Sequence, residues 1–140
     1  MKQVFDPIRR VWVAATPEEL VRQQWIMRLI DDLHFPKELL AVEKELQSLS
    51  NSKTPSRRID LLSFMKQDST LSPLLLIECK EGNLTQRALN QAIGYNYYVN
   101  APYVALVNQE QARFISILSP SYREITYIPS YDQLTERKRG

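Results

Sequence analysis

The sequence has little of the residues from which many small proteins build zinc sites or disulfides. Its 140 residues include one cysteine, Cys79, and one histidine, His34. One cysteine excludes an internal disulfide, and so few Cys and His ligands argue against a structural zinc site. No apolar run approaches the roughly 20 residues of a membrane-spanning helix, and the N-terminus lacks the apolar stretch of a secretion signal. We therefore expect a soluble, cytoplasmic protein without membrane association.

Neither sign of charge is in large excess, and glycine is scarce. Eighteen Lys and Arg against 16 Asp and Glu give a net charge of +2, and there are three glycines. That balance permits nucleic-acid binding without arguing for it. The 44% of hydrophobic residues is ordinary for a globular protein, and the length corresponds to one domain. We expect a single domain over residues 1–140, with residues 135–140 as a disordered, polar tail.

The N-terminal part of the sequence predicts a short strand followed by a helix. Residues 11–13 are apolar and short enough for a strand. Thr16 then fits an N-cap, Pro17 the first turn, and Glu19 the far end of a capping box. The helix should end near His34, because Pro36 disfavours helical geometry in the residue before it. Its apolar residues fall largely on one side: Leu20, Val21, Trp25, Met27, Leu29, Ile30 and Leu33.

The middle of the sequence predicts a series of strands. Residues 39–46 fit a helix or a strand, and we favour a strand that carries Glu43 and Glu45. A polar loop over residues 51–56 precedes an alternating strand at 59–65, and we expect a turn at 67–73. The next strand, 74–80, begins Leu-Leu-Leu-Ile. That apolar run is typical of a central strand covered on both faces.

The C-terminal half predicts one more helix and further strands. Thr85 can cap a helix that runs to about Val99, with apolar positions at Leu89, Ala92, Ile93 and Tyr97. Residues 103–107 and 114–118 fit strands, and 125–128 fits one more. The expected fold is therefore α/β, with a central mixed sheet flanked by helices.

Two polar residues stand where this central strand should be apolar. Alternate side chains of a strand share a face, so Glu78 and Lys80 project together and Cys79 points the other way. An acid and a base are costly to bury without partners, so this strand end should open onto a site. Asp60 precedes Glu78 by 18 positions (78 − 60). If the two strands pair as a hairpin, Asp60 lies beside Glu78.

Two adjacent carboxylates repel each other and need a cation between them. Hard oxygen ligands select Mg²⁺ or Mn²⁺. Such a metal polarises a phosphate and lowers the pKa of a bound water. Lys80 on the same face could orient that water or neutralise charge in the transition state. Together these groups describe phosphodiester hydrolysis. The alternative is that Glu78 and Lys80 form an ordinary solvated pair.

Several short motifs resemble the PD-(D/E)XK nuclease superfamily. They are residues 58–60 (Arg-Ile-Asp), 76–80 (Leu-Ile-Glu-Cys-Lys) and 91–95 (Gln-Ala-Ile-Gly-Tyr). Within the superfamily, the sequence is most similar to the N-terminal nuclease domain of type I restriction enzyme R subunits and small stand-alone relatives. The similarity covers roughly residues 5–108 and includes the segments at 5–9, 16–19 and 21–23. Ile59, where many members have proline, removes no ligand.

The resemblance implies a restriction-endonuclease-like fold and a role for each matching residue. Asp60 and Glu78 would be metal ligands, with the backbone carbonyl of Cys79 as a third. Lys80 would be the catalytic lysine. Glu19 resembles a first-helix glutamate that some members direct towards the metal, although the capping box is the alternative. The residues implied to assist catalysis or contact DNA are Gln91 and Tyr95, four apart on one helix face.

Other residues near these motifs have ordinary alternatives. Arg57 and Arg58 could contact phosphate or balance the acidic site. The tyrosines at 95, 97 and 98 could stack on bases, but tyrosines near a helix end more often serve packing. Four further basic residues are interpreted as charges that favour solubility: Arg9, Arg10, Arg137 and Lys138. We expect Cys79 to be a small buried hydrophobic residue and His34 to lie at the end of a helix.

The function that these observations favour is a Mg²⁺-dependent endonuclease acting on DNA. No helix-turn-helix or zinc-finger pattern is present, so target choice would come from a specificity or motor protein partner, a homodimer, or DNA structure. The alternative is a catalytically silent module of the same fold that binds DNA or a protein partner. Hydrolysis of RNA would use the same chemistry.

Overall fold

The structure is a computed structural model that describes residues 2–45, 57–118 and 123–139. A six-stranded mixed sheet has the strand order β3-β4-β5-β6-β7-β8, and a separate hairpin pairs β1 with β2. Neighbouring strands are antiparallel except for β5 and β6, which are parallel. The expectation of an α/β fold with a central mixed sheet is confirmed. The strands are β1 (Gln3–Asp6), β2 (Val11–Ala14), β3 (Leu40–Glu45), β4 (Arg58–Gln67), β5 (Thr70–Cys79), β6 (Tyr103–Val107), β7 (Ala112–Ser116) and β8 (Arg123–Ile125).

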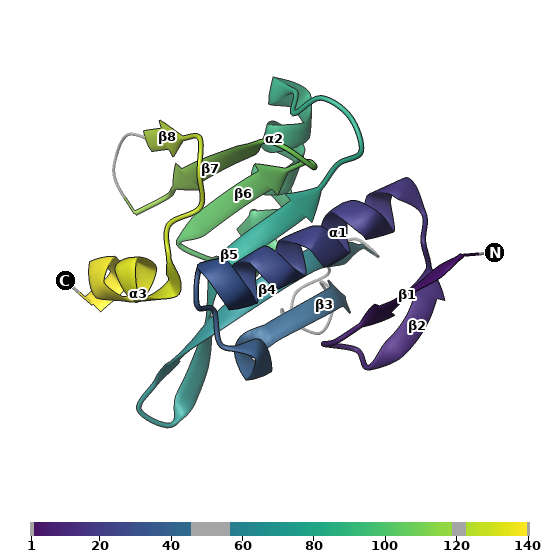
Figure 1. Ribbon diagram of the computed structural model, residues 1–140. Helices are drawn as coiled ribbons and strands as arrows, with labels where there is room; N and C mark the ends of the chain where they lie inside the picture. Colours follow the sequence, from purple (N-terminus) through teal and green to yellow (C-terminus); the bar gives the residue numbers. More distant parts are fainter. Residues whose placement is uncertain (1, 46–56, 119–122, 140) are drawn as a thin grey trace.

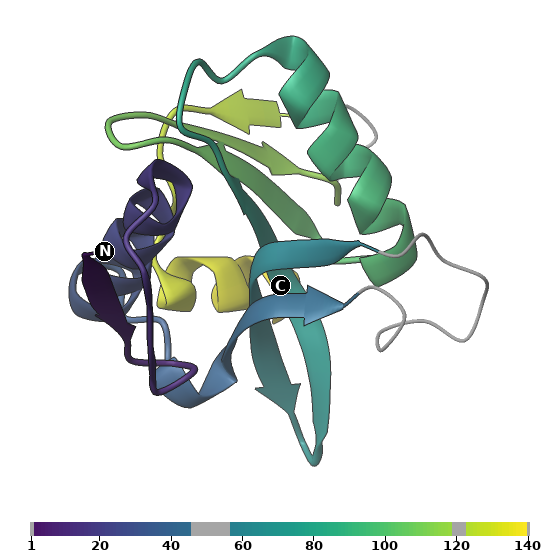
Figure 2. The same ribbon diagram turned by 90° about the vertical axis from the view of Figure 1, so that its right-hand side faces the viewer.

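Helices cover both faces of the sheet (Figures 1 and 2). Helix α1 (Pro17–Met27) and helix α3 (Tyr131–Arg139) lie on one face, and helix α2 (Gln86–Val99) lies on the other. Helix α2 joins the parallel strands β5 and β6, which require such a crossover connection. Strand β5 is consequently covered on both sides.

The two long helices begin at the predicted residues. The Thr16 hydroxyl accepts a hydrogen bond from the Glu19 backbone N–H at 3.2 Å, and the Thr85 hydroxyl accepts one from the Ala88 N–H at 3.1 Å. A π-helical turn, Arg28–Asp32, continues α1 towards His34, where φ is 58° and the helical path has ended. Both predicted starts are confirmed, as is the end near His34.

The β4–β5 hairpin is longer than predicted. The strands are paired as far as Gln67 and Thr70, so the turn does not occupy residues 67–73. Asp68 adopts φ 55°, which places it in the left-handed region that tight turns need. Pro73 lies inside β5, next to the register shift between Ser63 and Phe64. The prediction was wrong because a proline is tolerated at a bulge, where the regular ladder is interrupted.

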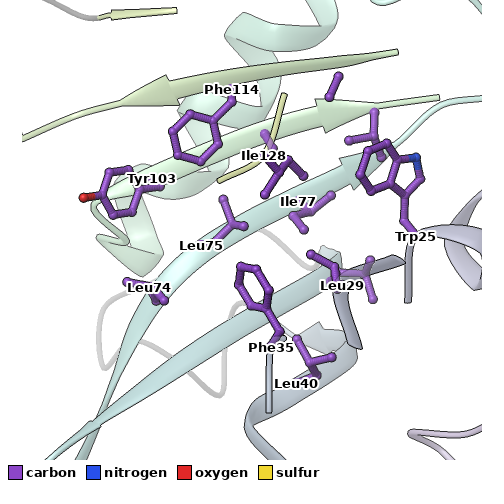
Figure 3. Packing of buried hydrophobic residues seen from close by; sticks show 14 of the residues in the cluster. Trp25, Leu29, Phe35, Leu40, Leu74, Leu75, Ile77, Tyr103, Phe114 and Ile128 are labelled. Carbon is purple, nitrogen blue, oxygen red and sulfur yellow. The ribbon is translucent and has the colours of Figure 1, made fainter. Parts of the chain in front are cut away.

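The main hydrophobic core lies between α1, α3 and the sheet. Figure 3 shows Trp25, Leu29 and Phe35 beside Leu75 and Ile77 of β5. The second layer, under α2, includes Ile59, Leu62, Leu76, Ala92, Val99, Ala101 and Val104. Three residues assigned to the apolar helix faces are exposed instead: Leu20, Met27 and Tyr97.

The C-terminal region differs from the prediction. Residues 131–139 form α3 rather than a frayed tail from 135, and Leu134 and Thr135 are buried. The last strand, β8, ends at Ile125 rather than spanning 125–128, and β7 runs over 112–116 rather than 114–118. The predicted loop at 51–56 lies outside the described residues. Within the described part, no helix is both long and apolar enough to cross a membrane.

Candidate active site

The candidate site lies where β4 separates from β5. The last backbone pair between them joins Leu61 to Ile77, so the next step along the register would place Asp60 opposite Glu78. Strand β5 stays paired with β6 for two more residues, through Cys79 and Val107. The predicted hairpin is confirmed, and it brings the two acidic residues together.

Beyond the last backbone pair, it is the Asp60 side chain that hydrogen-bonds to the backbone of β5. Its Oδ2 accepts a hydrogen bond from the Cys79 backbone N–H at 2.8 Å. Its Oδ1 accepts one from Nη2 of Arg22, in α1, at 2.7 Å. Asp60 is only 8% exposed. The carboxylate is therefore held between the sheet and α1.

Glu78 is buried beside Asp60 with an unsatisfied oxygen. The residue is 7% exposed, and within the described part of the chain its Oε1 has no hydrogen-bond partner. Burial, followed by repulsion from the Asp60 carboxylate, raises the pKa of Glu78 well above its usual range, although the Lys80 charge opposes this. Such a carboxylate is costly without a cation.

Lys80 follows directly after β5 and is half-buried. Its backbone N–H donates to the Val107 carbonyl at 2.8 Å, which extends the contact between β5 and β6 by one residue. Cys79 is fully buried in the core under α1, together with Leu75 and Ile77. Leu76 instead packs under α2. The alternation predicted for this strand therefore holds from Leu75 to Cys79, whereas Leu74, at the register shift, lies in the same core as Leu75.

An ion-pair network that the sequence did not reveal surrounds Asp60. Nη1 of Arg22 donates to Oε1 of Glu19 at 2.9 Å and to Oε1 of Glu43 at 3.1 Å. Arg9 bonds Asp6 at 2.7 Å and Glu19 at 3.0 Å. The i, i+3 spacing of Glu19 and Arg22 was the one visible signal, since such residues share a helix face. Arg9 is part of this network and is not a free solubility charge.

Glu19 does not complete the predicted capping box. Its backbone N–H is capped by Thr16, but its carboxylate accepts from Arg9, Arg22 and Gln23. The Thr16 N–H donates to the Ala14 carbonyl instead. The capping interaction is therefore one-sided, because cations from two elements compete for the carboxylate. The metal role of Glu19 stays a prediction.

The predicted DNA-contacting residues lie in or near α2 and β4. Gln91 is exposed on α2. Tyr95, one turn later, packs against the layer under α2, and the Arg57 guanidinium lies 5.0 Å from the centre of its ring. Arg58 is paired with Glu43 at 3.3 Å and Glu45 at 3.4 Å. Arg58 thus balances acidic neighbours, as one alternative predicted.

The side chains at the candidate site supply only some of the ligands that a small divalent cation needs. No three His, Cys, Asp or Glu side chains in residues 2–45, 57–118 and 123–139 form a metal-holding group. Side chains alone would thus supply two ligands, Asp60 and Glu78. The unpartnered Glu78 oxygen next to a second carboxylate is nevertheless the donor set of a hard cation that keeps several waters.

The comparisons with known proteins agree with this architecture. No curated protein matches the sequence. Among solved structures, the chain is similar to the fragment structure of a putative HsdR subunit of a type I restriction enzyme from Vibrio vulnificus YJ016, with 12% identity and a TM-score of 0.58. The match covers 89% of this chain and 25% of that one, so the chain spans a quarter of the fragment's length. At this identity the similarity shows the fold.

The family is shown by a match that covers most of the sequence. The family model described as the type I restriction enzyme R protein N terminus matches residues 17–129. That range contains α1 with Arg22, Asp60 on β4, and Glu78 with Lys80 at the end of β5. The chain therefore belongs to the family of the type I restriction enzyme R protein N terminus.

Proposed function

We propose that this protein is a Mg²⁺- or Mn²⁺-dependent endonuclease of the PD-(D/E)XK type that hydrolyses DNA. The observation that carries the proposal is the buried carboxylate pair of Asp60 and Glu78, in which Glu78 Oε1 lacks a partner among the described residues. A structural ion pair would satisfy that oxygen. A pair that awaits a cation would leave it free.

Each residue of the site has a task in this proposal. Asp60 and Glu78 would hold the cation, with the Cys79 backbone carbonyl as a third ligand. The bound cation would supply Lewis-acid stabilisation of a phosphate and a water of lowered pKa. Lys80, two residues after Glu78, would orient the attacking water or offset the negative charge that develops on the phosphate.

The supporting groups for DNA lie on the α2 side. The Arg57 guanidinium lies 5.0 Å from the centre of the Tyr95 ring and would offer a positive charge to a phosphate. Gln91 is exposed one turn before Tyr95 on α2 and could position DNA or the catalytic groups. Phosphate contacts of this kind position DNA but read no sequence. We therefore propose that a specificity or motor protein partner, or a homodimer, supplies target choice.

A cleavage assay tests the proposal. Purified protein is incubated with supercoiled, linear and single-stranded DNA, and with RNA, in Mg²⁺, Mn²⁺ or EDTA. We expect metal-dependent nicking that Asp60→Asn and Lys80→Ala both abolish, and that Gln91→Ala weakens. The matched control is Asp68→Asn, because Asp68 is an exposed turn residue at φ 55°, a conformation that asparagine tolerates.

Circular dichroism checks that each variant is folded, and a metal-binding measurement on the same variants separates loss of the cation from loss of catalysis. Lys80→Ala should bind Mn²⁺ like the wild type, because it removes no ligand, whereas Asp60→Asn should not. If Lys80→Ala cleaved DNA at the wild-type rate, the proposed mechanism would be wrong. A folded wild-type protein that binds Mn²⁺ but cuts no substrate would favour the silent module that binds DNA or a partner.

A further inference from the structure

The guanidinium of Arg22 occupies the centre of an acidic cluster made of residues from three elements. It contacts Glu19 of α1, Glu43 of β3 and Asp60 of β4 at 2.9, 3.1 and 2.7 Å. Arg22 is only 5% exposed. Glu19 and Asp60 are buried, so water would screen their mutual repulsion poorly without Arg22. The Glu43 side chain is 33% exposed. Arg22 thus provides a positive charge that all three carboxylates share, while Arg9 also contacts Glu19 and Glu43, and Arg58 contacts Glu43.

Glu43, one of the partners of Arg22, has an unfavourable backbone conformation. Val42 pairs with Leu61 and Lys44 with Ile59, so Glu43 lies across from Asp60 in the register. Glu43 has φ 53°, a left-handed conformation that is unfavourable for a residue with a side chain. Such strain persists only where the surroundings compensate for it, and often near functional sites. Here the compensation comes from the ion pairs of Glu43 with Arg22, Arg9 and Arg58.

Arg22 also contacts one of the two proposed metal ligands directly. Its Nη2 lies 2.7 Å from Asp60 Oδ1. Glu78, the other ligand, is 7% exposed, and its Oε1 has no partner among the described residues. A fixed positive charge at this distance must weaken the attraction of a second cation for Asp60. It also holds the Asp60 carboxylate in place before any cation arrives.

We propose that Arg22 is a positioning residue that acts as the resident counter-cation of the acidic cluster. It stabilises the metal-free fold and, by its charge, lowers the affinity of the Asp60–Glu78 pair for a divalent cation. This inference rests on the proposed metal site. It states that a residue which is not itself a ligand, Arg22, sets how tightly the site binds a divalent cation.

Arg22→Gln separates this role from a purely structural one. We expect the midpoint of thermal unfolding without metal to fall by roughly 10 °C, because a buried ion-pair partner is lost. We expect the Mn²⁺ affinity of the folded variant, measured by electron paramagnetic resonance at a temperature below unfolding, to rise on the order of tenfold. Mn²⁺ should accordingly raise its unfolding midpoint more than that of the wild type.

Three matched variants complete the experiment. Arg22→Lys keeps the charge and should keep the Mn²⁺ affinity of the wild type. Glu43→Gln removes a negative charge from the cluster and should lower the affinity. Arg113→Gln breaks the ion pair of Arg113 with Glu124 between β7 and β8, away from the site, and should cost some stability without changing Mn²⁺ binding.

The outcomes distinguish the two proposals. Equal Mn²⁺ affinity in the wild type and Arg22→Gln would overturn the counter-cation role while leaving the metal site intact, and so would weaker binding by Arg22→Gln. Absence of Mn²⁺ binding by both proteins, with both folded, would overturn the metal site and with it this inference.

Discussion

Glu78 is the residue whose charge should cost the metal-free protein most, so Glu78→Gln is the most informative stability variant. Glutamine has nearly the same shape but carries no charge. Its amide can also donate a hydrogen bond to the neighbouring Asp60 carboxylate, which a carboxylate cannot do. We therefore expect a substitution in a candidate active site to stabilise the apoprotein.

The magnitude follows from the burial of Glu78. The residue is 7% exposed and its Oε1 has no partner among the described residues. A buried, unsatisfied polar group costs about 1–3 kcal/mol. We expect Glu78→Gln to raise the free energy of unfolding by about 2 kcal/mol at pH 8. For a chain of this length that corresponds to an unfolding midpoint higher by roughly 6 °C.

The gain should depend on pH in a defined direction. Burial, then the Asp60 carboxylate, raises the pKa of Glu78 in the folded protein well above its unfolded value. The folded state thus binds the proton more tightly, and stability falls as pH rises through the folded pKa. Below the unfolded pKa, about 4.3, Glu78 is protonated in both states. The advantage of Glu78→Gln should therefore be large at pH 8 and small near pH 4.

Urea and thermal unfolding of both proteins in EDTA, from pH 4 to pH 8, measure this effect. Glu81→Gln, at an exposed position three residues further on, is the matched control and should change little. The reasoning is refuted if Glu78→Gln is less stable than the wild type at pH 8, or if the difference between them is the same at every pH. Saturating Mg²⁺ should stabilise only the wild type.

Two further predictions concern residues outside the proposed metal site. Asp6 is buried, and although burial opposes it, hydrogen bonds from Arg9, Gln23 and Ile8 lower the Asp6 pKa. A carboxyl whose pKa is lower in the folded than in the unfolded protein stabilises the fold at pH values above its unfolded pKa. Asp6→Asn should therefore lower the free energy of unfolding by about 2 kcal/mol at pH 7. The cost should shrink below about pH 4, and a constant cost in urea unfolding would contradict this. The Cys79 thiol is fully buried, and burial, followed by the Asp60 charge, raises its pKa. A thiol-specific dye should therefore label Cys79 only as fast as the protein opens or unfolds, and rapid labelling of the folded protein would show that the strand end is open.

The sequence was sufficient to predict the acidic pair, because a hairpin fixes which residues meet. Asp60 and Glu78 needed only the pairing of two adjacent strands. Their burial was not predicted, because the sequence indicated a strand end that opens onto a site. The two helix starts were equally local, because Thr16 and Thr85 each bond a backbone N–H three residues later.

Two of the errors share a physical cause, which is contact between distant segments. The C-terminal segment looks polar and basic, yet the burial of Leu134 and the contact of Tyr131 with Phe35, ring centres 5.5 Å apart, place it in the core as α3. Glu19 was assigned to a capping box, but Arg9 and Arg22 bind its carboxylate more strongly than a backbone N–H would.

What the sequence by itself determined is therefore the set of local elements and the acid–acid–lysine pattern at one strand end. What only the tertiary structure decided is the charge balance of that site. Arg22 meets Glu43 and Asp60 across 21 and 38 positions of sequence. Such pairings depend on how α1 packs on the sheet, because side chains on different elements meet only after the core has formed, and no local periodicity encodes them.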